Sequence, residues 1–174
     1  MRDEIRSIRL YCALGPGLDD VRSALRTSVW PWLRSQAEKR GCILTVVELR
    51  DGAPGSDPDE TILKWTFHEI DRCAPFFISI VGNDVGPAPR KIPPEAFLFE
   101  PWITRFKGAS ISELEVRRAM ERRSEIFTPR LFLIERPGGS DAPPSKRREL
   151  LAAAAREMGA LVVSCEGELE TITE

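Results

Sequence analysis

Two serine–glutamate pairs interleave in KGASISELEV (107–116), where a turn becomes a helix. Ser110 with Glu113, and Ser112 with Glu115, each have the three-residue spacing of a capping box, in which serine and glutamate satisfy each other's backbone amides. Only one pair can cap the helix, which leaves the other carboxylate for another role. A glutamate beside a water-excluding pocket can attack a glycosidic carbon or stabilise an oxocarbenium-like centre. The spacing equally allows a cap plus a surface glutamate, so both interpretations stay open.

Two glycine-bounded turns are the other candidates for ligand binding. ALGPG (13–17) contains Gly15 and Gly17, whose backbone amides could meet a phosphate or carboxylate at the start of the next helix. GNDVG (82–86) contains Asn83 and Asp84, whose side chains could hold a ribose hydroxyl. The glycines match neither a P-loop nor the GxGxxG pattern. An ordinary turn is therefore the alternative at both places.

The histidine and cysteine content argues against a metal centre and a disulfide framework. The chain has one histidine and four cysteines, which are widely spaced with no CxxC pair. We expect buried free thiols in a reducing cytoplasm. The N-terminus lacks the apolar stretch of a secretory signal, and no apolar run reaches the roughly 18 residues of a membrane helix. We therefore predict a cytoplasmic protein with no metal and no membrane partner.

The bulk composition fits one compact domain. The 174 residues are 42% hydrophobic and 30% charged, with a net charge of −2. This balance lacks the basic excess of a nucleic-acid-binding domain, so we expect no nucleic-acid partner. The final stretch, 166–174, is typical of the start of a further helix. We therefore expect residues 1–174 to form a single domain at the N-terminal end of a longer, multidomain protein.

Hydrophobic periodicity predicts alternating strands and helices. The expected strands are 8–13, 43–49, 76–81, 131–134 and 161–164, and the expected helices are 18–40, 61–73, 110–123 and 146–158. Pro31 should kink the first helix or force a local rearrangement. The proline-punctuated connection 82–109 is either functional or pinned by its aromatic residues. The arginines and glutamates of 113–125 form a mixed-charge face, which we expect to be solvated or to bind a partner.

Strict alternation of strands and helices predicts an α/β fold with a five-stranded parallel sheet. Right-handed crossovers make the order 2-1-3-4-5 the simplest topology, a flavodoxin-like three-layer sandwich. Ligands of such sheets bind beyond the carboxyl ends of the strands, where the strand order reverses. That point lies between the first and third strands. The loops 13–17 and 82–89 and the helix that begins at Ser110 should therefore lie close together.

Several of these segments resemble one protein family. The motifs VWPWLRSQAEKRG (29–41), VELRDG (47–52), EIDRCAPFFISIVG (69–82) and SISELE (110–115) are similar to TIR-like domains. These domains are found at the N-termini of NACHT-type NTPases and of WD-repeat or TPR proteins, including the vault telomerase-associated and bacterial antiphage members. The resemblance covers nearly the whole chain, and EIDRCAPFFI is its most specific part. It also accounts for Pro31, which helix rules alone do not.

The resemblance implies a TIR-like fold in a protein of innate immunity or antiphage defence, with protein partners or self-association. In related folds, a glutamate early in the corresponding helix attacks or stabilises the ribosyl carbon of NAD or a nucleoside. That role would fall on Glu115, or on Glu113, with NAD as substrate rather than cofactor. CALGPG and NDVGP replace the family's Ser-Ser-Thr-Phe and ERYGW at the nucleotide pocket. We therefore expect assembly to be the main role, with NAD glycohydrolase activity as the alternative.

Overall fold

The central sheet is parallel. The computed structural model describes residues 6–48, 58–89, 92, 100–122, 128–135 and 145–166. Within these residues the strands are β1 (Arg6–Leu14), β2 (Cys42–Val47), β3 (Phe77–Val81), β4 (Arg130–Glu135) and β5 (Leu161–Glu166). They form one sheet in the order β2-β1-β3-β4-β5, and each neighbouring pair runs parallel. The α/β class and the parallel sheet are thus confirmed.

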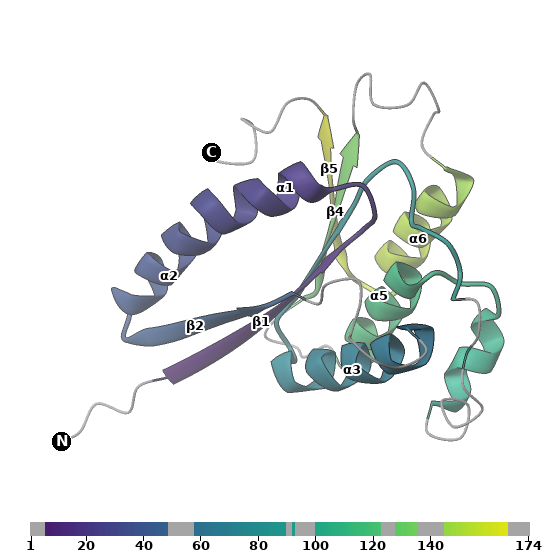
Figure 1. The fold of residues 1–174 in the computed structure, drawn as a ribbon, viewed down its shortest axis with the longest axis horizontal. Coiled ribbons are helices and arrows are strands. Elements are labelled where there is room, and N and C mark those ends of the chain that lie inside the picture. The colour runs from purple at the N-terminus through teal and green to yellow at the C-terminus, as the bar shows by residue number, and fades with distance from the viewer. Residues whose placement is uncertain are drawn as a thin grey trace.

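Helices cover both faces of this sheet (Figure 1). One face carries α1 (Asp19–Ala24), the π-helical segment η1 (Leu25–Val29) and α2 (Trp30–Glu38). The other face carries α3 (Pro58–Cys73), α5 (Ile111–Glu121) and α6 (Lys146–Glu157). A 3₁₀ helix, η2 (Pro101–Phe106), precedes α5. None of the helices described here combines the length and the apolar character that crossing a membrane requires.

The two faces of β1 explain why the core has two parts. Successive side chains of a strand point to opposite faces. Leu10 and Cys12 accordingly pack with α1, η1 and Trp30, whereas Tyr11 and Ala13 pack with α3, α5 and α6. Both faces of β3 are covered in the same way, as its continuous apolar sequence predicts.

Pro31 coincides with a rearrangement of the first helix, as predicted. Proline cannot donate a backbone hydrogen bond, and its ring crowds the preceding turn. The helix widens just before it, where the Trp30 amide bonds to the carbonyl of Leu25, five residues back. The Glu48 carboxylate, which follows β2, supports this segment. It accepts hydrogen bonds from Arg26 and, at 2.6 Å, from the Trp30 indole.

Aromatic side chains pin the described end of the connection between β3 and α5. Ile103 is completely buried, and Trp102 and Phe106 pack against the same part of the core. The ring centroids of Phe67 and Trp102 lie 5.6 Å apart, and those of Trp102 and Phe106 lie 6.1 Å apart. This confirms, for residues 100–109, the prediction that aromatic residues pin the connection. The stretch 93–99 lies outside the described residues.

Element boundaries differ from the expected ones by a few residues. Helix α3 begins at Pro58, inside the stretch that the sequence predicts to be a loop. Strand β5 extends to Glu166, and the rest of the expected final helix, 167–174, lies outside the described residues.

Candidate functional site

The loops that follow β1 and β3 touch each other. The amide of Gly15 donates a 2.8 Å hydrogen bond to the carbonyl of Ile80. A Cβ at Gly86, where φ is +85°, would lie 3.2 Å from Cγ of Pro16. Gly17 also has a positive φ, +70°, which favours glycine. The structure therefore brings together the two glycine-bounded turns that the sequence singles out.

Asn83 and Asp84 accept hydrogen bonds from their own loop and from the residue that caps α6. The Asp84 carboxylate accepts a 2.8 Å hydrogen bond from the amide of Val85. The Asn83 carbonyl accepts a 2.9 Å bond from the amide of Ser145, the residue that caps α6. Oδ1 of Asn83 is buried and has no hydrogen-bond partner in the described part of the chain. This oxygen therefore keeps an unused capacity to accept a hydrogen bond.

Ser110 and Glu113 form the capping box of α5. Glu113 Oε2 accepts a 2.6 Å hydrogen bond from the Ser110 amide, and Ser110 Oγ accepts a 3.3 Å bond from the Glu113 amide. Ser112 lies two residues after Ser110 and is buried. The first of the two serine–glutamate pairs is therefore the one that caps the helix.

Arg147, from the first turn of α6, connects this cap to the neighbouring loops. Its guanidinium forms a short ion pair with Glu113 and donates hydrogen bonds to the carbonyls of Gly108 (3.0 Å) and Gly86 (3.4 Å). Glu113 therefore lies at the carboxyl edge of the sheet, near the turn 82–86. The sequence reasoning missed Arg147, because nothing in its local sequence distinguishes it from the charged residues around it.

Glu115 points elsewhere, into the core beneath the sheet. Its carboxylate accepts a 2.8 Å hydrogen bond from the Tyr11 hydroxyl, and the residue is only 7% exposed. Tyr11 lies three residues before the end of β1, about 10 Å along the strand from Leu14. Burial and the neighbouring carboxylate raise the pKa of Tyr11 well above its ordinary value. The structure thus separates Glu115 from the edge where Glu113 lies.

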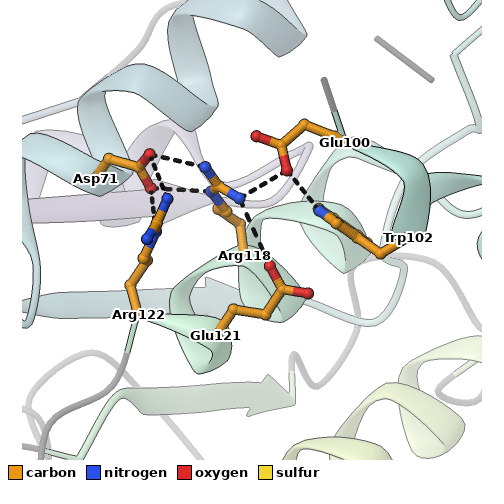
Figure 2. Close-up of polar contacts among 6 residues, drawn as sticks. All are labelled: Asp71, Glu100, Trp102, Arg118, Glu121 and Arg122. Carbon is orange, nitrogen blue, oxygen red and sulfur yellow. Dashed lines mark hydrogen bonds and ion pairs between the residues drawn. The ribbon is translucent and has the colours of Figure 1, made fainter. Parts of the chain in front are cut away.

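An ion-pair network joins α3, α5 and the segment before η2 (Figure 2). Arg118 makes two bonds to Asp71, of 2.9 and 2.7 Å, and one of 2.7 Å to Glu100. Arg122 contacts the same Asp71 carboxylate, and the Trp102 indole donates to Glu100. Burial opposes the charge of Asp71, but the two guanidinium groups outweigh it and hold its pKa below the usual range.

This network corrects the expectation for the mixed-charge face of α5. Arg118 is 6% exposed and Glu115 is similarly buried, so neither belongs to a solvated face. The network also explains the EIDRC segment. Glu69 accepts 2.8 Å bonds from Arg9 of β1 and from Arg72, while Asp71 binds α5. Asp71 and Arg72 therefore each pair with a neighbouring side chain of opposite charge.

The thiols and acids do not assemble into a metal centre in the region that the structure describes, where no group of three or more histidine, cysteine or acidic side chains could hold an ion. Cys12 and Cys73 are free and buried, as predicted, and Cys42 is free and half-buried. Burial raises the pKa of both buried thiols, which keeps them in the unreactive protonated form. The side chain of Cys165 lies outside the described residues.

Comparison with known proteins gives one similarity to part of the chain. A stretch of 78 residues, 41% of this chain, is 30% identical to NACHT domain- and WD repeat-containing protein 1 of Mus musculus. The chain spans only about 5% of the length of that relative. No family model matches the chain, and no solved structure matches it. The chain is thus loosely related, over part of its length, to a protein that contains NACHT and WD-repeat regions.

Proposed function

We propose that the chain is a TIR-like module of a defence-type, NACHT-associated protein and that it acts mainly by protein–protein assembly. The partial similarity to the mouse NACHT and WD-repeat protein supports this context. The strand order β2-β1-β3-β4-β5, with helices on both faces, is the flavodoxin-like arrangement that a TIR-like domain requires. Fold alone does not assign a function, so the role is inferred from the residues of the candidate site.

The observation that carries the assembly role is that both candidate acids are engaged in structural contacts. Glu113 caps α5 and pairs with Arg147. Glu115 is buried against Tyr11. A glutamate that attacks a ribosyl carbon must reach its substrate, and each of these side chains would first have to give up a hydrogen bond made to a charged group, worth about 1.5–3 kcal/mol. Binding of a protein partner to the outer surfaces of the helices does not require either glutamate to give up its hydrogen bond.

Assembly is tested by measuring the mass of the 174-residue chain in solution as a function of concentration. Sedimentation velocity is expected to show reversible association that grows with protein concentration. A chain that stays strictly monomeric at the highest attainable concentration would contradict the assembly role. Thermal unfolding of the same samples verifies that the protein is folded at every concentration.

A second candidate function, cleavage of the N-glycosidic bond of NAD or a nucleotide, is favoured by one observation. Arg147 holds Glu113 near the turn 82–86, which touches the turn 13–17. This is the edge where ligands of such sheets bind. NAD would be the substrate in this reaction, and Glu113 or Glu115 the attacking or stabilising acid.

The test is to incubate the chain with NAD and to measure nicotinamide release. Glu113→Gln and Glu115→Gln each keep the size of the side chain and remove the charge, and Glu38→Gln on the exposed part of α2 is the control. The catalytic role predicts that one of the first two changes abolishes turnover while Glu38→Gln does not. Turnover that survives both changes, together with a lower melting temperature, assigns these acids a structural role only.

A further inference from the structure

Arg117 of α5 is held by an aromatic ring rather than by an acid. Its guanidinium carbon lies 3.7 Å from the centre of the Phe106 ring. Nε of Arg117 is buried and has no hydrogen-bond partner within the part of the chain that the structure describes. The neighbouring arginines differ, because Arg118 and Arg122 both bind the Asp71 carboxylate (Figure 2). The position of Arg117 is thus fixed, while its charge is left for another group.

The glutamates nearest to Arg117 along α5 pair with other arginines. Glu113, four residues before it, binds Arg147, and Glu121, four residues after it, lies 3.5 Å from Arg118. Burial lowers the pKa of Arg117 below its ordinary value, and the attraction of Glu113 offsets this effect only in part. A further carboxylate beside Arg117 would therefore offset the remaining cost of burying its charge.

Other cations lie around the Arg117–Phe106 pair. Arg105 and Lys107 flank Phe106 in the chain, and both are exposed. Arg147 reaches over from α6 and donates a 3.0 Å hydrogen bond to the carbonyl of the residue after Lys107. We call these four cations, Arg105, Lys107, Arg117 and Arg147, the basic surface.

The basic surface has an excess of positive charge when the acids beside it are counted. Glu113 lies within it, and the exposed Asp84 and Glu149 lie at its margins, together with the exposed Lys146. The acids of the network in Figure 2 bind arginines of that network instead. Five cations therefore face three carboxylates, although the whole chain has a net charge of −2. Such a local excess attracts acidic groups.

We propose that the basic surface binds an acidic segment of a partner protein, with one carboxylate of the partner on the guanidinium of Arg117. The terminal nitrogens of a guanidinium can donate two parallel hydrogen bonds to a carboxylate. Arg105 and Lys107 attract further acidic side chains of the segment. The ion pair between Glu113 and Arg147 stays intact. This surface goes beyond the assembly role proposed above, because it defines the chemistry of a partner and does not require a second copy of this chain.

A nucleic acid fits the basic surface less well than an acidic peptide does. Proteins that bind single strands add exposed aromatic rings on which the bases stack. Here Phe106 is covered by Arg117, and Trp102 packs against the core. A phosphodiester backbone also carries a charge at every nucleotide, so it would meet Asp84 and Glu149 as well. A peptide can present its carboxylates only where the cations lie.

The first test measures binding of labelled probes to the 174-residue chain by fluorescence anisotropy. The probes are an oligoglutamate peptide, an oligoglutamine peptide of the same length and an oligouridine. We expect the oligoglutamate to bind, more weakly as salt is added, and the oligoglutamine not to bind. Absence of oligoglutamate binding at low salt overturns the proposal. Tighter binding of the oligouridine overturns the acidic protein segment and assigns the surface to a nucleic acid.

The second test locates the site with Arg117→Met, which keeps an apolar stem over Phe106 and removes the guanidinium. Loss of the bidentate contact should weaken the dissociation constant of the oligoglutamate about tenfold. Arg34→Met, which makes the same charge change on the exposed side of α2, is the control and should weaken it less than about twofold. Equal effects of the two variants overturn the proposed surface.

A second pair of variants keeps the test valid if Arg117→Met fails to fold. Lys107→Glu and Lys39→Glu make the same charge reversal at two exposed positions, the first within the basic surface and the second just after α2. Lys107→Glu should weaken oligoglutamate binding by at least about threefold more than Lys39→Glu does. Equal losses overturn the location of the site. Melting temperatures verify that every variant compared is folded.

Failure of this proposal and failure of the assembly role give different results. A chain that associates with itself but does not bind the oligoglutamate keeps the assembly role and overturns the basic surface. A strictly monomeric chain that binds the oligoglutamate, and loses this binding with Arg117→Met, contradicts self-association and supports the basic surface.

Discussion

The buried hydrogen bond between Tyr11 and Glu115 gives the sharpest test of the structure. Its length is 2.8 Å, and both residues are buried. Hydrogen bonds to charged groups contribute about 1.5–3 kcal/mol, and removing the donor also leaves the carboxylate with one partner fewer. Tyr11→Phe keeps the ring that stacks on Phe77 and removes only the hydroxyl. We therefore expect it to lower the free energy of unfolding by about 2 kcal/mol.

A double-mutant cycle separates this bond from other effects of the two substitutions. Tyr11→Phe, Glu115→Gln and the double variant are compared by urea unfolding, followed by the fluorescence of the four tryptophans. The double variant should lose at least about 1 kcal/mol less than the sum of the single losses, because the second change finds the bond already broken. A coupling energy within about 0.3 kcal/mol of zero would refute the placement of Glu115 beneath β1. Glu38→Gln, on the exposed side of α2, should change stability by less than about 0.5 kcal/mol.

Two further predictions concern charge. Arg118→Met removes the guanidinium between Asp71 and Glu100 and should cost about 3 kcal/mol in urea unfolding, since the two acids are left facing one another. Glu121→Ala, at the 3.5 Å and more exposed contact, should cost less than about 0.5 kcal/mol, and equal losses would contradict the geometry. Tyr11 is the only tyrosine, so ultraviolet absorbance reports its ionisation alone. Because its folded pKa is raised above 10.0, the phenol should stay protonated in the folded chain as pH rises past that value, and stability should fall from there upward. Ionisation of Tyr11 near its ordinary pKa of 10.0, in a chain that stays folded, would show that the Tyr11 hydroxyl is accessible to solvent.

Local patterns predicted the elements well because each depends on residues close in sequence. The apolar runs of β1 and β3 place both strands within two residues of their observed bounds. Pro31 signalled a disturbance of the first helix. The form of that disturbance depends on Glu48, which arrives from the end of β2 to bind Trp30, and helix rules do not contain such a contact.

The contacts of the candidate site depend partly on the local sequence and partly on residues far away in the chain. The register of the capping box was one of two that the sequence allowed. Once Glu113 occupies the cap, Glu115 lies two residues on and points about 200° around the helix, so the two acids cannot face the same edge. The sequence alone implies this separation of the two acids. It does not imply the contact between Glu113 and Arg147, 34 residues away, or the burial of Arg118 against Asp71, 47 residues away. These contacts arise only when the layers of the fold pack together.

The position of β1 in the sheet has a consequence for synthesis of the chain. β1 leaves the ribosome before β2 and β3, yet it lies between them in the sheet. Its second neighbour is complete only when Val81 has been made. Until then one edge of β1 offers unpaired backbone groups, which can pair with other nascent chains. Slower elongation over 48–76 should therefore favour misassembly on this edge, whereas the same slowing after 81 should not.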